Sequence, residues 1–429
     1  MRNIKRLKSK IKYLYENADI KAKFKLNSIK YPIYAYLKIT TKCMLKCSFC
    51  SQWGINNDDM EIEKAKEILN ELRKLGTEFI YYTGGEPLLY YKIEELIQYG
   101  YELGFKQILV TNGLLFKDKR YRKLAKFLIN IGVSLHGLPE IHNRLVGDID
   151  CFDSVIDNIK KVQEENEHIK ISINCTATNA NTNYESFEFL AKLCKKNKWQ
   201  LYIARLNYVG RAKNIKFIDL NNMLEIVDKL NEKGYYIKIS NCIIPCVVDK
   251  KYEYLTHGCG AGVSMVAIES NGDVKICSTS NYIIGNLNKN NFKTIWNCKI
   301  NNEFKNLNWL PNDCKLCKNF LKCRGGCKAE ITGEYWKQSC DVTLNNYNNL
   351  IWKNIKNKKI NLAFDLIRKE EKDKYLTISF PKRICNEITF KLLKQIDGTK
   401  TANEIAGDNL EKIDILVNLK KDNLLEIIN

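Results

Sequence analysis

The stretch Cys43-Met44-Leu45-Lys46-Cys47-Ser48-Phe49-Cys50 places three thiols within eight residues. An alternating apolar pattern over Tyr34–Ile39 precedes it and predicts a strand that ends just before a cysteine-bearing loop. One such loop can wrap three corners of an iron-sulfur cube. These cubes normally take four thiolates, so three cysteines leave one iron open for a substrate. A zinc site is the alternative, although zinc sites prefer paired cysteines at fixed short spacing.

Cysteine is frequent along the whole chain, with 17 among 429 residues. The N-terminal region is basic but contains no apolar block long enough for a signal peptide, and no run of about 18 apolar residues occurs anywhere. We therefore expect a cytoplasmic protein with no membrane partner. Because a cytoplasmic chain of this size folds without disulfides, soft-metal ligation is the better explanation for the cysteines.

The formal net charge of +20 is compatible with nucleic acid, a membrane surface or an acidic peptide as partner. The lysines, however, are scattered through the chain and form no single tract. Scattering favours a solvated basic surface, and we expect no nucleic-acid partner.

Helix and strand patterns alternate regularly after the cysteine loop, up to about residue 235. The predicted helices are Ile62–Leu75, Ile93–Leu103, Tyr121–Asn130, Ser154–Glu165, Tyr184–Lys195 and Asn221–Lys233, and the strands between them are Phe79–Tyr82, Gln107–Val110, Ile131–Leu135, Ile169–Thr176 and Gln200–Arg205. Such alternation implies parallel strands with right-handed crossovers, hence an α/β barrel or an open doubly wound sheet. From about residue 236 the pattern breaks into short pieces, and Asn271-Gly272-Asp273 predicts a hairpin.

The CxxxCxxC pattern after the first predicted strand resembles the signature of the radical S-adenosylmethionine (SAM) superfamily. The resemblance implies a partial (β/α)6 barrel of the TIM type and a 4Fe-4S cluster on Cys43, Cys47 and Cys50. It also implies that the open iron binds the amino and carboxylate groups of SAM. An electron from a donor such as flavodoxin or ferredoxin then cleaves the sulfonium, giving methionine and a 5'-deoxyadenosyl radical. Phe49 occupies a position where the family often places an aromatic ring over the adenine.

Thr83-Gly84-Gly85-Glu86-Pro87 follows the second predicted strand and resembles the GGEP loop of this superfamily. The glycines Gly84 and Gly85 allow the backbone to approach a ligand closely, and the Glu86 carboxylate can receive the ammonium of SAM. An accidental glycine turn is the alternative, but the distance from the cysteine loop is the one that the family has.

Further cofactor-binding candidates follow the third and fourth predicted strands, at the open end of the barrel where ligands collect. Asn112 resembles a family position there. Ser134 and Arg144 are candidates for holding the carboxylate and ribose of SAM, because the planar Arg fork matches a carboxylate. An ordinary turn serine and a surface arginine explain both residues equally well. We assign no acid-base role to His136 or His142, since hydrogen bonding within the fold explains both, and the catalytic residue stays unknown.

A second set of cysteines resembles the SPASM extension of radical SAM enzymes, although spacing alone would also permit zinc ribbons. The pattern comprises Cys259, Gly272, Cys277, Cys314, Cys317, Cys323, Cys327 and Cys340. The resemblance implies two auxiliary 4Fe-4S clusters, and thus three clusters in total. It assigns Cys259, Cys277 and Cys327 to the first auxiliary cluster, and Cys314, Cys317, Cys323 and Cys340 to the second.

The first auxiliary cluster needs a fourth ligand upstream of Cys259. Cys246 is the better candidate and Cys242 the second, with an open iron that binds substrate as the alternative. The remaining cysteines fit no ligand spacing, and we expect buried free thiols at Cys151, Cys175, Cys194, Cys298 and Cys385. The segment Arg205–Ala212 also resembles one that is common in SPASM enzymes, without an evident chemical role.

The C-terminal region shows a strand, three helices and a strand, which suggests a small winged-helix module. These elements are Tyr375–Phe380, Glu387–Ile396, Ala402–Ala406, Glu411–Lys421 and Leu424–Ile428. Asn386–Thr389 and Ile396–Thr401 resemble the PqqD-like module of ribosomal-peptide pathways, which binds the leader of a precursor peptide as an added strand. A DNA-binding winged helix is the alternative.

We therefore predict four parts: a basic helical extension (1–33), a radical SAM core (34–235), a SPASM domain (236–345) and a connector with a PqqD-like module (346–429). The leading hypothesis is an oxidoreductase that abstracts a hydrogen atom from a ribosomally made precursor peptide. It would install an oxidative crosslink, either a thioether or a carbon-carbon bond. The alternatives are a sulfatase-maturating enzyme that forms formylglycine and a non-catalytic iron-sulfur redox sensor that binds DNA. Sulfatase-maturating relatives usually carry an Asp base where this chain has Ser278.

Overall fold

The computed structural model describes most of the chain up to residue 330 and selected parts of the remainder. The described residues are 29–52, 59–216, 218–245, 248–280, 282–307, 310, 319–330, 356–357, 359–362, 375–377, 383–385, 392–393, 395–409, 411–413, 415–416 and 425–428. The candidate ligands Cys246, Cys314, Cys317 and Cys340 lie outside these ranges, as does the predicted extension up to residue 28. The chain divides into two compact units, Met1–Tyr335 and Trp336–Asn429, and each is described by itself.

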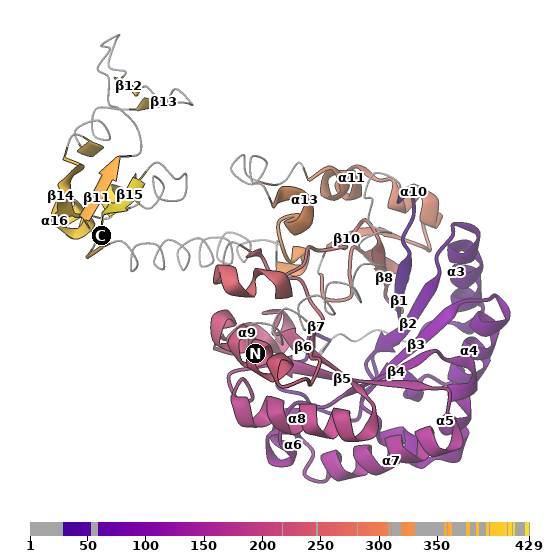
Figure 1. Ribbon diagram of the computed structural model, residues 1–429. Helices are drawn as coiled ribbons and strands as arrows, with labels where there is room; N and C mark the ends of the chain where they lie inside the picture. Colours follow the sequence, from indigo (N-terminus) through magenta and orange to yellow (C-terminus); the bar gives the residue numbers. More distant parts are fainter. Residues whose placement is uncertain are drawn as a thin grey trace. The chain divides into compact units, whose positions relative to one another are not determined.

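The first unit is built on a curved sheet whose first seven strands are parallel and adjacent in chain order (Figure 1). The strands are β1 (Tyr34–Thr40), β2 (Phe79–Gly84), β3 (Lys106–Thr111), β4 (Asn130–Ser134), β5 (Lys170–Ala177), β6 (Gln200–Arg205) and β7 (Lys238–Ile239). The helices are α3 (Ile62–Lys74), α4 (Ile93–Glu102), α5 (Lys119–Arg122), α6 (Pro139–Val146), α7 (Cys151–Glu165), α8 (Tyr184–Asn197) and α9 (Leu220–Glu232). The predicted α/β architecture, a partial barrel with a largely parallel sheet, is confirmed.

The core lies between the sheet and its outer layer of helices. In β1 the alternate residues Ala35, Leu37 and Ile39 are fully buried, as the period of two in a strand requires. Leu69 and Leu72 of α3 are buried as well, since residues three or four apart share one face of a helix. This packing leaves the carboxyl ends of the strands free to carry functional side chains.

Two local predictions differ from the structure. The expected helix Tyr121–Asn130 is a short α5 followed by a 3-10 turn at Lys123–Phe127. Arg122 explains the break, because its buried guanidinium donates to the carbonyls of Phe116 and Lys117 and pairs with a distant glutamate. Helix α6 was not predicted, although Pro139 in its first turn and Gly147 just past its end are the usual signals.

The predicted hairpin is confirmed and extends the same sheet. It joins β8 (Met265–Ile268) to β9 (Asp273–Lys275), and β10 (Ile283–Asn286) follows antiparallel to β9. Strand β8 runs parallel to β1, so the cysteine-rich region continues the barrel sheet directly. Short helices complete this region: α10 (Phe292–Trp296), α11 (Lys299–Asn306) and α13 (Phe320–Cys323).

The second unit contains a three-stranded antiparallel sheet in the order β14-β11-β15. Its elements are β11 (Lys359–Leu362), β14 (Asp397–Thr401), α16 (Ala402–Ala406) and β15 (Leu425–Ile428), with a separate pair of strands, β12 (Tyr375–Thr377) and β13 (Arg383–Cys385). Helix α16 coincides with its prediction and begins with a capping box between Thr401 and Glu404. The predicted helices Glu387–Ile396 and Glu411–Lys421 fall only partly within the described residues.

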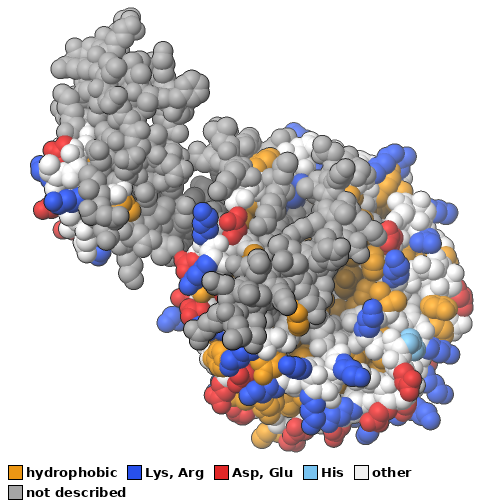
Figure 2. Space-filling model, viewed as in Figure 1, with side chains coloured by type: hydrophobic (Ala, Val, Ile, Leu, Met, Phe, Trp, Pro, Cys, Tyr) orange, Lys and Arg blue, Asp and Glu red, His pale blue; other side chains and the backbone are white. Residues whose placement is uncertain are grey.

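The surface agrees with the scattered charge seen in the sequence. On the face in Figure 2, Lys and Arg side chains alternate with Asp and Glu side chains and do not collect into one patch. No helix in the described part of the chain is both long and apolar enough to cross a membrane.

Candidate functional site: two groups of thiols around one cavity

A cavity of about 1110 Å³ opens at the carboxyl ends of the barrel strands. Strand ends β1 to β6 contribute lining residues, among them Lys38, Gly84, Thr111, Ser134, Thr176 and Arg205. One side is closed by the first cysteine loop, with Cys43, Cys47 and Cys50, and another side by Cys242, Cys259, Cys277 and Cys327. Two groups of thiols that are far apart in the sequence therefore face the same space.

The first group sits on the loop after β1, as predicted. Burial, together with the charges of the neighbouring Cys50 and Cys43, raises the pKa of Cys47 to about 12. Partial burial also raises the pKa of Cys43, which is the most exposed of the three cysteines. The ionised thiols thus need a bound cation, and an iron cluster supplies it.

Two other segments hold this loop in place. The backbone N–H groups of Lys46 and Ser48 donate to carbonyl oxygens of α6, at 3.1 and 2.9 Å. On the opposite side the N–H of Arg211 donates to the Cys50 carbonyl at 3.1 Å, and its guanidinium donates to the Lys46 carbonyl at 2.9 Å. Gly210 makes this approach possible, since an added Cβ would lie 2.7 Å from the Cys50 oxygen. The segment at the end of Arg205–Ala212 therefore supports the cysteine loop, a role the sequence did not reveal.

Gly84 and Gly85 pack against the backbone that leads into the cysteine loop. The N–H of Gly85 donates to the Thr40 carbonyl at 2.8 Å, and that of Glu86 donates to the Lys42 carbonyl at 2.7 Å. A Cβ would lie 2.3 Å from the Thr40 oxygen at Gly84 and 2.2 Å from the Lys42 oxygen at Gly85. Both positions need glycine for this close approach.

The Glu86 carboxylate is buried and accepts three hydrogen bonds from the protein. They come from the Thr111 hydroxyl at 2.8 Å, the Asn112 N–H at 2.8 Å and the Leu88 N–H at 3.1 Å. Burial raises its pKa to about 7, although the hydrogen bonds act in the opposite direction. Glu86 thus ties the end of β3 to the loop after β2, and its pairing with the ammonium of SAM stays a prediction.

Of the four other residues predicted to bind the cofactor, three line the cavity and one does not. Phe49, Asn112 and Ser134 line the cavity, whereas Arg144 is exposed on α6 and does not. The Phe49 ring contacts His136 edge to face, with ring centroids 4.7 Å apart.

His136 and His142 form hydrogen bonds within the fold. His142 Nδ1 accepts the backbone N–H of His136 at 3.2 Å, and His136 Nδ1 accepts that of Thr176 at 3.1 Å. Burial lowers the pKa of both rings, for His142 to about 4. Both imidazoles are therefore neutral near pH 7, with the proton on Nε2.

The second group of thiols contains Cys242 in addition to the three predicted residues. The Cys242 side chain lies close enough to Cys259 and Cys327 for the three to interact, which raises the pKa of Cys242. Cys277 also lies within reach of the charges of Cys259 and Cys327. Cys246, ranked first from the sequence, lies outside the described residues. In the described part of the chain, no group of three or more His, Cys, Asp or Glu side chains is arranged to hold a single metal ion.

The surroundings of these four thiols suit an anionic cluster. Lys328 is fully buried and its ammonium donates to the Ala261 carbonyl at 2.7 Å, while the Ala261 N–H donates to the Cys259 sulfur at 3.4 Å. The buried Arg324 Nε has no hydrogen-bond partner among the described residues. Four soft ligands beside two cations that have no carboxylate partner among the described residues fit an iron-sulfur cluster bound through thiolates.

The other described cysteines do not line the cavity. Cys323, a predicted ligand of the second auxiliary cluster, is the last residue of α13 and is half-buried. Cys151, Cys175 and Cys194 are buried and free, as expected. Cys298 is only half-buried, and its sulfur accepts the Asn301 N–H at the start of α11.

Sequence comparison agrees with this site. Residues 37–194 match the radical SAM superfamily, and residues 259–324 match the iron-sulfur cluster-binding domain called SPASM. The protein is a radical SAM enzyme with a SPASM domain.

Known relatives have several activities. The AdoMet-dependent heme synthase of Methanosarcina barkeri is 22% identical, over 70% of this chain and 93% of the relative. Streptococcus suis SuiB, crystallised with S-adenosylmethionine, is 22% identical with a TM-score of 0.62, covering 73% of this chain and 76% of SuiB. SuiB has also been crystallised with its precursor peptide SuiA. anSMEcpe with AdoMet and the Cp18Cys peptide is 18% identical with a TM-score of 0.54, covering 74% of this chain and 100% of anSMEcpe.

Proposed function

We propose that this enzyme abstracts a hydrogen atom from a ribosomally made precursor peptide and installs an oxidative crosslink, a thioether or a carbon-carbon bond. The supporting observation is the single cavity of about 1110 Å³ that both groups of thiols line. A peptide side chain held there can react on one side and pass an electron to the other. SuiB and anSMEcpe, which share the fold, have both been crystallised with peptides.

Three 4Fe-4S clusters and SAM are the proposed cofactors. Cys43, Cys47 and Cys50 would hold the first cluster, and the four thiols Cys242, Cys259, Cys277 and Cys327 would hold the first auxiliary cluster. The second auxiliary cluster would use Cys323 with Cys314, Cys317 and Cys340. When bound, SAM and the first cluster supply a 5'-deoxyadenosyl radical, given an electron from flavodoxin or ferredoxin.

Crosslinking removes two hydrogens from the peptide while a carbon-sulfur or carbon-carbon bond forms. One hydrogen leaves as an atom to the 5'-deoxyadenosyl radical, and the other leaves as a proton. The remaining electron passes to the auxiliary site, so that the charge balances. Cys242 gives that site a fourth thiol, which favours electron transfer there over direct binding of substrate to an open iron.

The C-terminal unit is proposed to be a PqqD-like winged-helix module that binds the peptide leader. In the order β14-β11-β15, both β14 and β15 are edge strands among the described residues. An edge strand has unpaired backbone groups that an extended leader can use. The apolar cluster of Leu392, Leu393, Ile405 and Leu416 supports a separately packed module.

The decisive experiment incubates the reconstituted enzyme anaerobically with SAM, a reductant and any short peptide that a neighbouring reading frame is found to encode. The expected result is 5'-deoxyadenosine together with a product about 2 Da lighter, since two hydrogens are lost. A variant with Cys43, Cys47 and Cys50 replaced by Ala is the control and should form neither. Formation of 5'-deoxyadenosine without any mass change in the peptide would contradict the proposal.

Formylglycine formation in a sulfatase is the second candidate, because both cluster regions resemble those of sulfatase-maturating enzymes. Ser278 counts against it, since it lines the cavity where those relatives usually carry an Asp base. Incubation with a CxPxR-type peptide tests this candidate, and an unmodified peptide would dispose of it.

A further inference from the structure

Four cationic side chains surround the second group of thiols and have one buried carboxylate between them. They are Lys38, Lys275, Arg324 and Lys328, and the carboxylate is that of Glu269. Lys38, Arg324 and Lys328 are 3%, 5% and 0% exposed. Cationic side chains are almost never buried without an anionic partner, so this arrangement needs an explanation.

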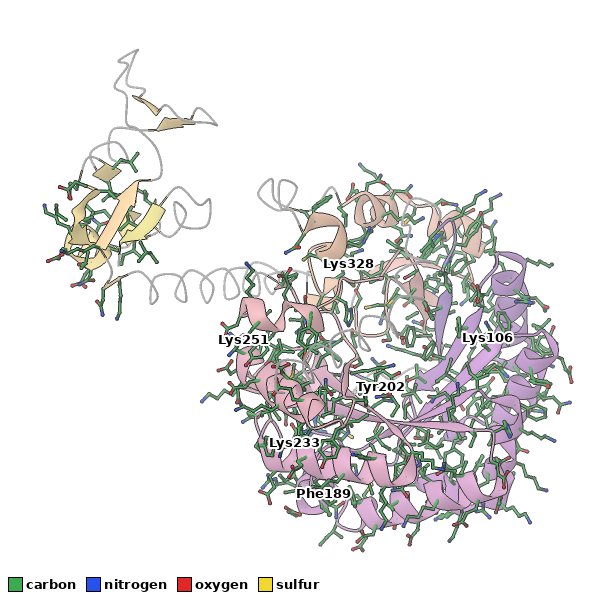
Figure 3. The ribbon with its side chains drawn as sticks, viewed as in Figure 1. Lys106, Phe189, Tyr202, Lys233, Lys251 and Lys328 are labelled. Atoms are coloured by element: carbon green, nitrogen blue, oxygen red, sulfur yellow. The ribbon has the colours of Figure 1, made fainter. Side chains whose placement is uncertain are left out.

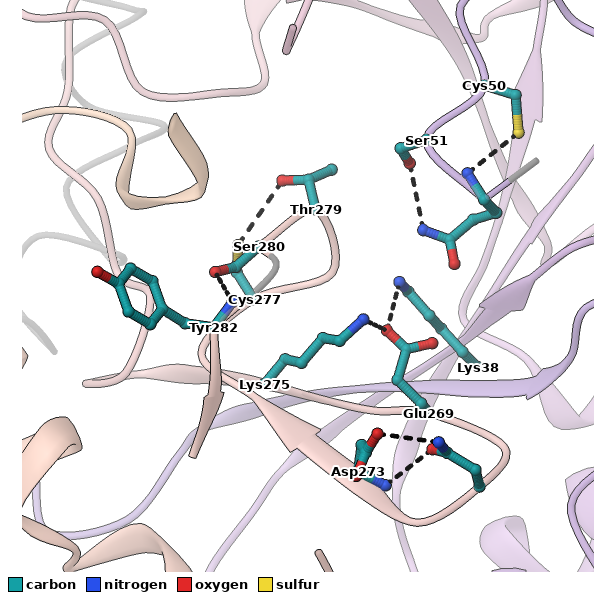
Figure 4. A network of polar contacts seen from close by, with 12 residues as sticks. Lys38, Cys50, Ser51, Glu269, Asp273, Lys275, Cys277, Thr279, Ser280 and Tyr282 are labelled. Atoms are coloured by element: carbon teal, nitrogen blue, oxygen red, sulfur yellow. Dashed lines mark hydrogen bonds and ion pairs between the residues drawn. The ribbon is translucent and has the colours of Figure 1, made fainter. Parts of the chain in front are cut away.

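Lys38 and Lys275 share the Glu269 carboxylate (Figure 4). Glu269 Oε1 lies 2.8 Å from the Lys38 ammonium and 2.7 Å from that of Lys275. Lys38 lines the cavity, and its ammonium is close enough to Cys277 to interact with the charge of that thiolate. Lys275 is the last residue of β9 and stands two residues before Cys277. This triad therefore keeps one positive charge in excess beside Cys277.

Arg324 and Lys328 lie in the segment around Cys327 (Lys328 is labelled in Figure 3). The Lys328 backbone lies near the Cys259 side chain, and the Lys328 ammonium is close enough to interact with Cys259, Cys242 and Cys277. Arg324 also interacts with Cys259. Within the described residues neither cation has a carboxylate partner.

The four cations together exceed Glu269 by three positive charges. The negative charge of four thiolates exceeds the positive charge of an iron-sulfur cube, so the bound cluster is anionic. Reduction adds one more negative charge to it. Buried cations stabilise the reduced form more than the oxidised form, because Coulomb interactions are strong where water is excluded. The net charge around a cluster is one of the factors that set its reduction potential.

We infer that Lys38, Lys275, Arg324 and Lys328 raise the reduction potential of the cluster held by Cys242, Cys259, Cys277 and Cys327. This inference rests on the proposed function, since it makes that cluster the acceptor for the electron that the peptide loses. The four cations act on this cluster through their charge.

The test is an EPR-monitored redox titration of the cluster-loaded enzyme without peptide, following the signal that Cys242→Ser abolishes. Lys38→Met and Lys328→Met each remove one buried charge and keep an unbranched side chain. Each should shift the midpoint potential to more negative values by about 59 mV, equivalent to about a tenfold change in the equilibrium of a one-electron couple. If Lys328→Met does not fold, Lys275→Met takes its place, because Lys275 belongs to the same four cations and its side chain is partly exposed.

Two control variants accompany these measurements. Lys106→Met makes the same substitution at an exposed lysine that pairs with Glu78, and Lys328→Arg keeps the buried charge. Both should retain the wild-type potential. The inference would be overturned if the potential stayed unchanged in Lys38→Met and in the second variant. That second variant is Lys328→Met, or Lys275→Met where only the latter binds the full complement of iron. Because no peptide is present, this result is independent of whether the enzyme crosslinks peptides.

Discussion

The backbone N–H of Arg211 donates to the carbonyl oxygen of Cys50 across 3.1 Å and so connects the segment after β6 to the first cysteine loop. The same loop hydrogen-bonds to α6 and to the backbone after Gly84. Three segments from different parts of the chain therefore fix one loop. This matters because an error of about 1 Å in the placement of reacting groups can cost roughly 100-fold in rate.

Gly210→Ala should disturb this loop directly. Gly210 has a φ of +59°, and its new Cβ would lie 2.7 Å from the Cys50 carbonyl oxygen, so the backbone must move. We expect 5'-deoxyadenosine formation to fall by about 10- to 100-fold. Gly234→Ala is the matched control, because Gly234 has a φ of +83° but nothing within 4 Å of an added Cβ. It should lose about 1 to 2 kcal/mol of stability and keep its activity. Equal activity in the two variants would refute the supporting role of Gly210.

Glu86→Gln should change how stability depends on pH. The folded-state pKa of about 7 lies above the ordinary value of 4.5, so the folded protein binds the extra proton between these pH values. The resulting stabilisation is complete below about pH 4.5 and is lost as pH rises through about 7. Relative to the variant, the wild type should lose on the order of 3 kcal/mol across this window. Thermal midpoints of both proteins, measured anaerobically across the window, provide the check.

The sequence identified residue types better than their orientations. The cysteine spacings indicated two groups of thiols, but the choice between Cys242 and Cys246 depends on how the chain folds before β8, which spacing does not record. Glu86 was recognised as a functional carboxylate, yet its direction depends on Thr111 and Asn112 in the next strand loop. In the same way, Arg122 ends a predicted helix through partners that sequence periodicity cannot reveal.

His142→Asn should alter the pH dependence in the opposite sense. Burial lowers the folded-state pKa of His142 to about 4, below the ordinary 6.5, so the unfolded chain binds more protons between these values. The stability is present above about pH 6.5 and falls as pH drops towards 4. Asn keeps an oxygen that can accept the His136 N–H but cannot titrate. The variant should therefore lose less stability on acidification, whereas Glu86→Gln should lose more. A change of the same sign in both variants would contradict these assignments.

Cys242→Ser should remove one cluster and leave the others. The Cys242 thiol contacts Cys259 and Cys327, so its loss leaves the first auxiliary cluster with three thiolates. We expect the bound iron to fall by about four atoms per chain, with the SAM-responsive EPR signal of the first cluster retained. Cys298→Ser is the matched control, since the Cys298 sulfur accepts the Asn301 N–H at the start of α11, a position where serine serves equally well. Cys246→Ser decides between the two upstream cysteines. If Cys246→Ser loses the iron and Cys242→Ser keeps it, Cys242 is not the fourth ligand.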